Sequence, residues 1–112
     1  MDSYEKAIFI AKVCADKRAG EIKVLDIRKL STLADFFVIC SGSSTKRTET
    51  IREAVEEELY KRGCRPWHRE GLFSATWILL DYGDVIVHIF YEPIRKFYAL
   101  DRLWGEAPVI EF

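Results

Sequence analysis

Hydrophobic and polar residues recur along this chain with two different periods, which predict helices and strands in a mixed order. Residues 3–19 and 45–62 have the three- to four-residue spacing of amphipathic helices. Residues 22–28 alternate apolar and polar positions like a half-buried strand, whereas residues 35–40 form the continuous apolar run of a strand covered on both faces. The predicted buried positions are Tyr4, Ile8, Ala11 and Ala15 in the first helix and Ile51, Val55 and Leu59 in the second.

Polar residues and glycines predict where these helices begin and end. Asp2 is spaced from Glu5 as in a weak capping box, and Gly20 stops the first helix. A hydroxyl side chain within residues 43–45 can cap the second helix, which ends at Gly63. The segment 64–71 contains a proline, so we expect at best a short edge strand or a loop there.

A β-hairpin is predicted where residues 73–80 and 85–92 flank the Asp-Tyr-Gly-Asp segment 81–84. A symmetric loop pairs positions whose numbers sum to 165, which places Trp77 opposite His88. The face expected to cover the helices carries Thr76, Ile78, Leu80, Val85, Val87, Ile89 and Tyr91. The opposite, mixed face carries Phe73, Ala75, Trp77, Leu79, Ile86, His88 and Phe90.

A third helix is predicted from Pro93 to Gly105, with Ile94, Phe97, Leu100 and Trp104 at helical spacing. Residues 106–112 are expected to form a short tail. The order of elements predicts an α/β (α+β) fold with a mixed β-sheet flanked by helices. With 112 residues, the chain is expected to be one domain, 1–112, with its core at about 2–105.

Composition narrows the classes of partner and compartment. The net charge of -1 argues against a protein that grips a polyanion by charge alone, and no DNA partner is expected. The three cysteines are far apart, which favours reduced thiols over a disulfide framework or a zinc site. The apolar runs are too short for a membrane span, and the N-terminus lacks a targeting pattern. We therefore expect a cytoplasmic protein, with some of its 15 aromatic residues on a recognition surface.

The Ser-Gly-Ser-Ser turn at 41–44 lies between a predicted strand and a helix, as a phosphate cradle does. In small nucleotidyltransferases such a turn is followed by a strand with two carboxylates two residues apart, which hold magnesium. This chain lacks that pair, because the acids downstream fall on a helix and at the 81–84 turn. We therefore expect no enzyme activity, no cofactor and no metal site.

Charge along the hairpin points to a different chemistry. From Phe73 to Glu92 there is no Lys or Arg, whereas Asp81, Asp84 and Glu92 are acidic. An aromatic surface with an acidic rim suits a basic protein better than a nucleic acid. It stays open whether Trp77 belongs to such a surface or packs under another segment. It also stays open whether His88 is satisfied internally or available to a partner.

Several linked motifs resemble the RsfS/Iojap family of ribosomal silencing factors. They are Ala-Asp-Phe-Phe-Val-Ile-Cys-Ser-Gly-Ser-Ser at 34–44, Trp77 with the hairpin segment 81–88, and the Tyr-Ala-Leu-Asp-Arg-Leu-Trp segment at 98–104. The resemblance extends from the first helix to Gly105, and it implies a nucleotidyltransferase-like topology that has lost catalysis. The positions that match the family pattern are Trp77, Asp81, Gly83, Asp84, His88, Tyr98, Leu100, Leu103 and Trp104.

The resemblance also implies a partner, the large ribosomal subunit, bound through its fourteenth protein so that the small subunit is sterically excluded and translation is repressed. On that basis we expect partner binding through Trp77, Asp81, Asp84, His88 and Tyr98. The alternatives are a self-associating module that forms a homodimer, a large-subunit assembly factor, and a nucleotide-binding transferase. No membrane partner is expected.

Overall fold

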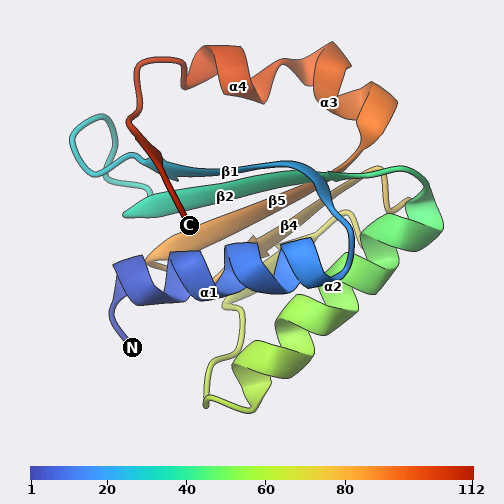
Figure 1. Ribbon diagram of the computed structural model, residues 1–112, viewed down its shortest axis with the longest axis horizontal. Helices are drawn as coiled ribbons and strands as arrows, with labels where there is room; N and C mark the ends of the chain where they lie inside the picture. The colour runs from blue at the N-terminus through green and yellow to red at the C-terminus, as the bar shows by residue number, and fades with distance from the viewer.

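The computed structural model describes residues 1–112 as one mixed β-sheet with helices on both faces (Figure 1). The helices are α1 (Ser3–Asp16), α2 (Thr45–Tyr60), α3 (Glu92–Tyr98) and α4 (Leu100–Leu103). The strands are β1 (Gly20–Asp26), β2 (Phe36–Gly42), β3 (His68–Glu70), β4 (Trp77–Asp81), β5 (Val85–Tyr91) and β6 (Val109–Ile110).

The sheet has the order β3-β4-β5-β2-β1-β6, in which β2 and β5 are parallel and the other neighbours are antiparallel. This confirms the predicted mixed α+β fold. The two parallel strands lie in the middle of the sheet, and every residue of β2 is buried, as its continuous apolar run predicted. The segment 64–71 contributes only β3, an exposed edge strand, in agreement with the prediction.

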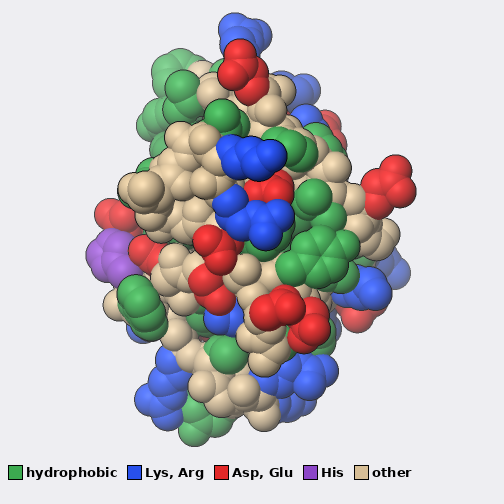
Figure 2. Space-filling view, turned by 90° about the vertical axis from the view of Figure 1, so that its left-hand side faces the viewer, with side chains coloured by type: hydrophobic (Ala, Val, Ile, Leu, Met, Phe, Trp, Pro, Cys, Tyr) green, Lys and Arg blue, Asp and Glu red, His purple; other side chains and the backbone are tan.

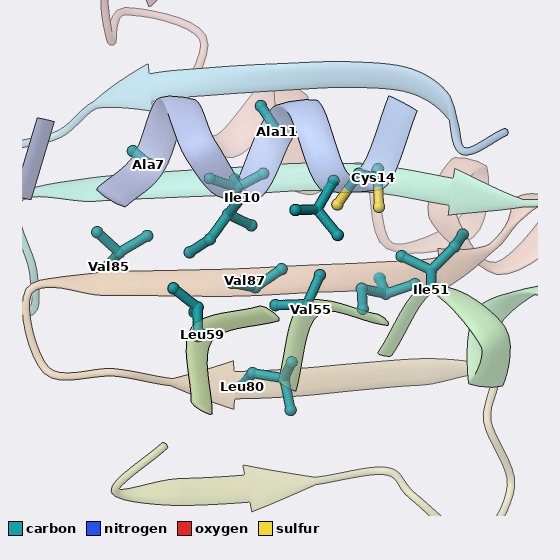
Figure 3. Packing of buried hydrophobic residues seen from close by; sticks show 14 of the residues in the cluster. Ala7, Ile10, Ala11, Cys14, Ile51, Val55, Leu59, Leu80, Val85 and Val87 are labelled. Carbon is teal, nitrogen blue, oxygen red and sulfur yellow. The ribbon is translucent and has the colours of Figure 1, made fainter. Parts of the chain in front are cut away.

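The larger core lies between the sheet and the helices α1 and α2, which both cover the same face (Figure 1). Figure 3 shows side chains of both helices and of the sheet meeting in this layer. The Ser44 hydroxyl caps α2 by accepting a hydrogen bond from the Arg47 backbone N–H at 3.0 Å. The predicted buried stripe of α2 is confirmed: Ile51, Val55 and Leu59.

The start of α1 is confirmed, but its predicted buried stripe is wrong. The Asp2 carboxylate accepts a hydrogen bond from the Glu5 backbone N–H at 2.8 Å, as the capping spacing indicated. Of the predicted stripe only Ala11 is buried, whereas Tyr4 and Ala15 are exposed. Apolar residues cover more than one side of this helix, so that spacing alone could not select the stripe that meets the sheet. The buried residues are Ala7, Ile10, Ala11, Val13 and Cys14.

A smaller core covers the other face of the sheet, beneath α3 and α4 (Figure 1). The single helix predicted from Pro93 to Gly105 is broken, because Ala99 adopts a left-handed conformation with φ 52°. The break turns Phe97 outward into solvent, while Leu100 is buried and Trp104 packs edge-on against Phe37 at 5.1 Å between ring centroids.

The hairpin has the predicted faces but a different register. Partners in β4 and β5 have numbers that sum to 167, so that Trp77 lies opposite Phe90 and Leu79 lies opposite His88. The Tyr82 backbone N–H donates to the Val85 carbonyl, which leaves a tight turn of two residues with Gly83 at φ 88°. A shift of the sum by two preserves which residues share a face.

Two segments differ from their predictions. Ala75, placed on the mixed face of the hairpin, lies before β4 begins and is buried in the larger core. The segment after Gly105, expected as a short tail, contains β6, which pairs with β1 through Val24 and Leu25. None of the four helices has the length and apolar character that a membrane crossing needs.

Candidate functional site

The mixed face of the hairpin is only partly covered by α3 and α4. Trp77, Leu79 and Asp81 alternate with buried residues along β4 and remain half-exposed, whereas β5 beside them is buried. A groove of about 360 Å³ opens there, lined by Glu70, Trp77 and Leu79. We call this region the β4 surface and define it by five residues: Glu70, Trp77, Leu79, Asp81 and Tyr98.

Trp77 is held in place by contacts on several sides. Its indole stacks on Phe90 at 4.9 Å between ring centroids and lies 4.8 Å from the ring of Tyr98. The indole Nε1–H donates a hydrogen bond to Nδ1 of His88 at 3.2 Å. The predicted contact between Trp77 and His88 is therefore present, although the two residues are diagonal rather than directly opposite.

His88 is buried, with 5% of its surface exposed, and Phe37 packs edge-on against its ring at 4.8 Å. Burial lowers the pKa of His88 to about 4, because the charged imidazolium would lose its hydration. The ring is thus neutral at physiological pH. Since Nδ1 accepts from Trp77, the proton belongs on Nε2, which has no hydrogen-bond partner. The sequence left open whether His88 is satisfied internally or available to a partner. In the structure Nδ1 is bonded to Trp77, and Nε2 has no partner.

Tyr98 lies at the end of α3 with 53% of its surface exposed, and it forms the accessible part of the aromatic cluster. The helix that carries it is anchored by Arg95, a buried residue of the same helix. The Arg95 guanidinium donates to the Ser41 hydroxyl at 2.8 Å and to the Glu21 carbonyl at 2.6 Å, and it pairs with Asp101 at 3.1 Å. This buried cation therefore joins α3 and α4 to the middle of the sheet.

The two predicted acidic residues occupy different surroundings. Asp81 lies on the same face as Trp77, at the other end of β4, and its carboxylate accepts the Gly83 backbone N–H at 2.7 Å. Asp84 instead pairs with Lys6 of α1 at 2.9 Å. The structure thus brings Trp77 and Tyr98 together, with His88 beneath them. It places Asp81 at the rim and Asp84 away from this cluster.

Sequence reasoning missed Glu70 as a member of the β4 surface. Glu70 lies directly opposite Leu79 in the antiparallel pair of β3 and β4, so that their side chains share a face. Its carboxylate lies 3.3 Å from Nε2 of His68 on the same strand. A proline two residues before His68 obscured the strand pattern, and only the pairing with β4 reveals the acid beside the aromatic groove.

The Ser-Gly-Ser-Ser turn has a structural role in this fold. Ser41 accepts from Arg95, and Ser44 caps α2. A Cβ on Gly42 would come within 2.8 Å of the Thr48 side chain, so that glycine permits the close approach of α2 to the end of β2. The arrangement offers a shaped surface with aromatic and acidic groups, which is chemistry suited to recognition.

Comparisons with known proteins agree with one another. The family model described as "Ribosomal silencing factor during starvation" (RsfS) matches residues 1–112. The ribosomal silencing factor RsfS of Bacillus subtilis is 40% identical over 101 residues, which cover 90% of this chain and 86% of that protein.

Solved structures give the same result. A crystal structure of a Chromobacterium violaceum protein superposes with a TM-score of 0.90 at 28% identity, covering 94% of this chain and 88% of that one. A crystal structure of a Bacillus halodurans protein has a TM-score of 0.81 at 32% identity, covering 97% and 96%. The match of fold and sequence over nearly the whole chain shows that this protein belongs to the RsfS family of ribosomal silencing factors.

Proposed function

We propose that this protein binds the large ribosomal subunit through its fourteenth protein and sterically prevents the small subunit from joining, which represses translation in the cytoplasm. The proposal assigns direct contact to Trp77 and Tyr98 and an acidic rim to Asp81. His88 supports the Trp77 ring from below, and Asp84 holds the hairpin turn against α1 through Lys6. No chemical step is required, because occupancy of the joining surface is enough to exclude the other subunit.

The observation that carries this proposal is the aromatic pair at the β4 surface. Tyr98 and Trp77 present a preorganised apolar surface beside the groove. The rim carries Glu70 and Asp81, and neither β4 nor β5 contains a Lys or Arg. Aromatic anchors surrounded by complementary charge are typical of protein interfaces, and this charge suits a basic ribosomal protein. The name of the Bacillus subtilis relative supports a ribosomal role.

Titration of the purified fourteenth protein of the large subunit with wild type and Tyr98→Ala tests this assignment. We expect the variant to bind roughly 30- to 1000-fold more weakly, since loss of an aromatic anchor typically costs about 2–4 kcal/mol. Tyr98 is half-exposed, so that its loss should leave the fold intact.

Tyr4→Ala is the matched control, because Tyr4 is 47% exposed and lies on α1, which covers the opposite face of the sheet. We expect it to bind like wild type. Equal affinities for wild type and Tyr98→Ala would remove Tyr98 from the interface.

A homodimer through the β4 surface is the second candidate, favoured by the same exposed aromatic groove. Sedimentation equilibrium of the protein alone distinguishes the two functions. If Tyr98→Ala abolishes a dimer but leaves binding to the fourteenth ribosomal protein unchanged, the β4 surface serves self-association rather than ribosome binding.

A further inference from the structure

The groove of about 360 Å³ at the β4 surface, which we call the β4 groove, is lined by Glu70, Trp77 and Leu79. These residues come from two neighbouring strands. Glu70 of β3 lies directly opposite Leu79 of β4, and Trp77 precedes Leu79 by two residues. In this register the three side chains project from the same face of the sheet. The groove therefore brings an aliphatic side chain, an aromatic ring and a carboxylate together.

The side chains of the β4 groove offer hydrogen-bond acceptors but no free donor. The indole Nε1–H of Trp77 already donates to Nδ1 of His88 at 3.2 Å, so that only the ring of Trp77 remains for a partner. The side chain of Leu79 is apolar, and an ionised carboxylate such as that of Glu70 only accepts hydrogen bonds. A group that binds here must therefore bring donors to Glu70 and an apolar stem to Leu79.

No Lys or Arg of this chain supplies such a group. Arg69 is the neighbour of Glu70 in sequence, but its guanidinium pairs with Glu56 of α2 at 3.2 Å, and neither β4 nor β5 contains a Lys or Arg. The Glu70 side chain is 63% exposed, and it pairs with the imidazole of His68 at 3.3 Å, a group that is charged only when protonated. Figure 2 shows acidic side chains beside the exposed histidine at one edge of the molecule. The Glu70 carboxylate is therefore accessible to a cation of a partner.

We propose that the β4 groove binds one arginine side chain of the basic ribosomal protein, with its stem against Leu79 and its guanidinium between the Trp77 ring and the Glu70 carboxylate. The inference rests on the proposed function and names the group that the β4 surface selects. Arginine fits better than lysine, because a planar guanidinium stacks on an aromatic ring and donates two parallel hydrogen bonds to a carboxylate. Glu70 is thus the residue that determines specificity for this cation.

Titration of the purified fourteenth ribosomal protein with wild type and Glu70→Gln tests the proposal, because glutamine keeps the size of the side chain and removes its charge. We expect the variant to bind roughly 5- to 30-fold more weakly at low salt, since the ion pair is partly desolvated in the complex. The difference in affinity between the two proteins should shrink as sodium chloride is added, because salt screens the ion pair. Loss of packing alone would not produce this salt dependence.

Glu57→Gln is the matched control. It removes the same charge from a side chain of similar exposure, but Glu57 lies on α2, which covers the opposite face of the sheet. We expect it to bind like wild type, which separates a local contact from the effect of net charge. The Glu70 side chain is exposed, so that Glu70→Gln should unfold at the same urea concentration as wild type.

Replacement of each arginine of the fourteenth ribosomal protein by methionine, one at a time, identifies the bound side chain. Wild type and Glu70→Gln are titrated with every one of these partner variants. We expect one arginine whose replacement weakens binding of wild type and leaves Glu70→Gln with no further loss of affinity. Such coupling between two substitutions indicates that the two side chains interact directly.

The arginine assignment is overturned if Glu70→Gln binds as tightly as wild type, or if it couples to a lysine or to no cation of the partner. These outcomes leave the proposed function standing, because they require that wild type binds the fourteenth ribosomal protein. Absence of saturable binding by wild type would instead contradict the proposed function, and the arginine assignment with it.

Discussion

At the scale of single residues, His88 and Arg95 are the two buried polar side chains that organise the β4 surface. His88 positions the Trp77 ring through one hydrogen bond, and Arg95 fixes the helix that carries Tyr98. They differ in electrostatics: His88 is kept neutral by burial, whereas Arg95 is charged and paired with Asp101. Protonation of His88 or loss of the Arg95 guanidinium should therefore lower the free energy of unfolding.

The stability of the protein should fall as the pH falls from about 6.5 toward about 4. The pKa of His88 is about 4 in the folded state and about 6.5 when unfolded, so that only the unfolded chain takes up the proton in this window. This contribution is fully present above pH 6.5, and its loss amounts to roughly 3 kcal/mol at the acid end.

Urea unfolding of wild type and His88→Gln between pH 7 and 5 measures this effect. The variant should be less stable at pH 7, and its stability should depend less on pH. His68→Gln is the control, because His68 is exposed, and it should keep the wild-type dependence. An unchanged pH dependence in His88→Gln would show that another group is responsible.

Arg95→Met should lower the free energy of unfolding by about 2–4 kcal/mol. The change leaves Asp101, the Ser41 hydroxyl and the Glu21 carbonyl without their donor. Arg102→Met, at an exposed arginine of α4, should stay within about 0.5 kcal/mol of wild type in the same urea titrations. Similar losses in both variants would contradict the anchoring role of Arg95.

At the scale of elements, the break between α3 and α4 decides which aromatic residues are exposed. Ala99 adopts φ 52°, a conformation that is unfavourable for a residue with a Cβ. The break lets Leu100 and Trp104 cover Phe37 and its neighbours while Tyr98 reaches Trp77. A continuous helix would carry these side chains in a different direction.

Ala99→Gly should stabilise the protein by about 0.5–1 kcal/mol, because glycine adopts a positive φ without strain and thereby offsets its entropy cost. The same substitution at Ala15, an exposed position inside α1, should destabilise by about 1 kcal/mol. Thermal unfolding of the two variants tests whether their stabilities change in opposite directions. Destabilisation by both substitutions would argue against a left-handed Ala99.

The helices and strands could be predicted from the sequence better than the breaks and pairings between them. The faces of the hairpin follow from alternation alone, so that Trp77, Leu79 and His88 were assigned to one face although the register was shifted. The break at Ala99 has no local signal, because alanine favours a continuous helix. The Glu70 carboxylate joined the site only through pairing of β3 with β4, a contact that single-chain periodicity does not contain.

At the scale of the whole molecule, the sheet separates two surfaces of different chemistry. The α3 and α4 side presents the β4 surface, with Trp77 and Tyr98 above an acidic rim. The segment 60–69, which follows α2, contains four Lys or Arg and no acid. The net charge of -1 is thus the sum of an acidic hairpin and of a remainder that contains all the basic residues. The acidic surface faces a basic protein in our proposal.

In our proposal, occupancy of the large subunit by this protein excludes the small subunit. The most direct measurement is sucrose-gradient sedimentation of purified large and small subunits mixed with increasing amounts of the protein. We predict that joined ribosomes decrease as the protein increases, that the protein migrates with the free large subunits, and that Tyr98→Ala requires a much higher concentration. Undiminished joined ribosomes that carry the bound protein would contradict the claim.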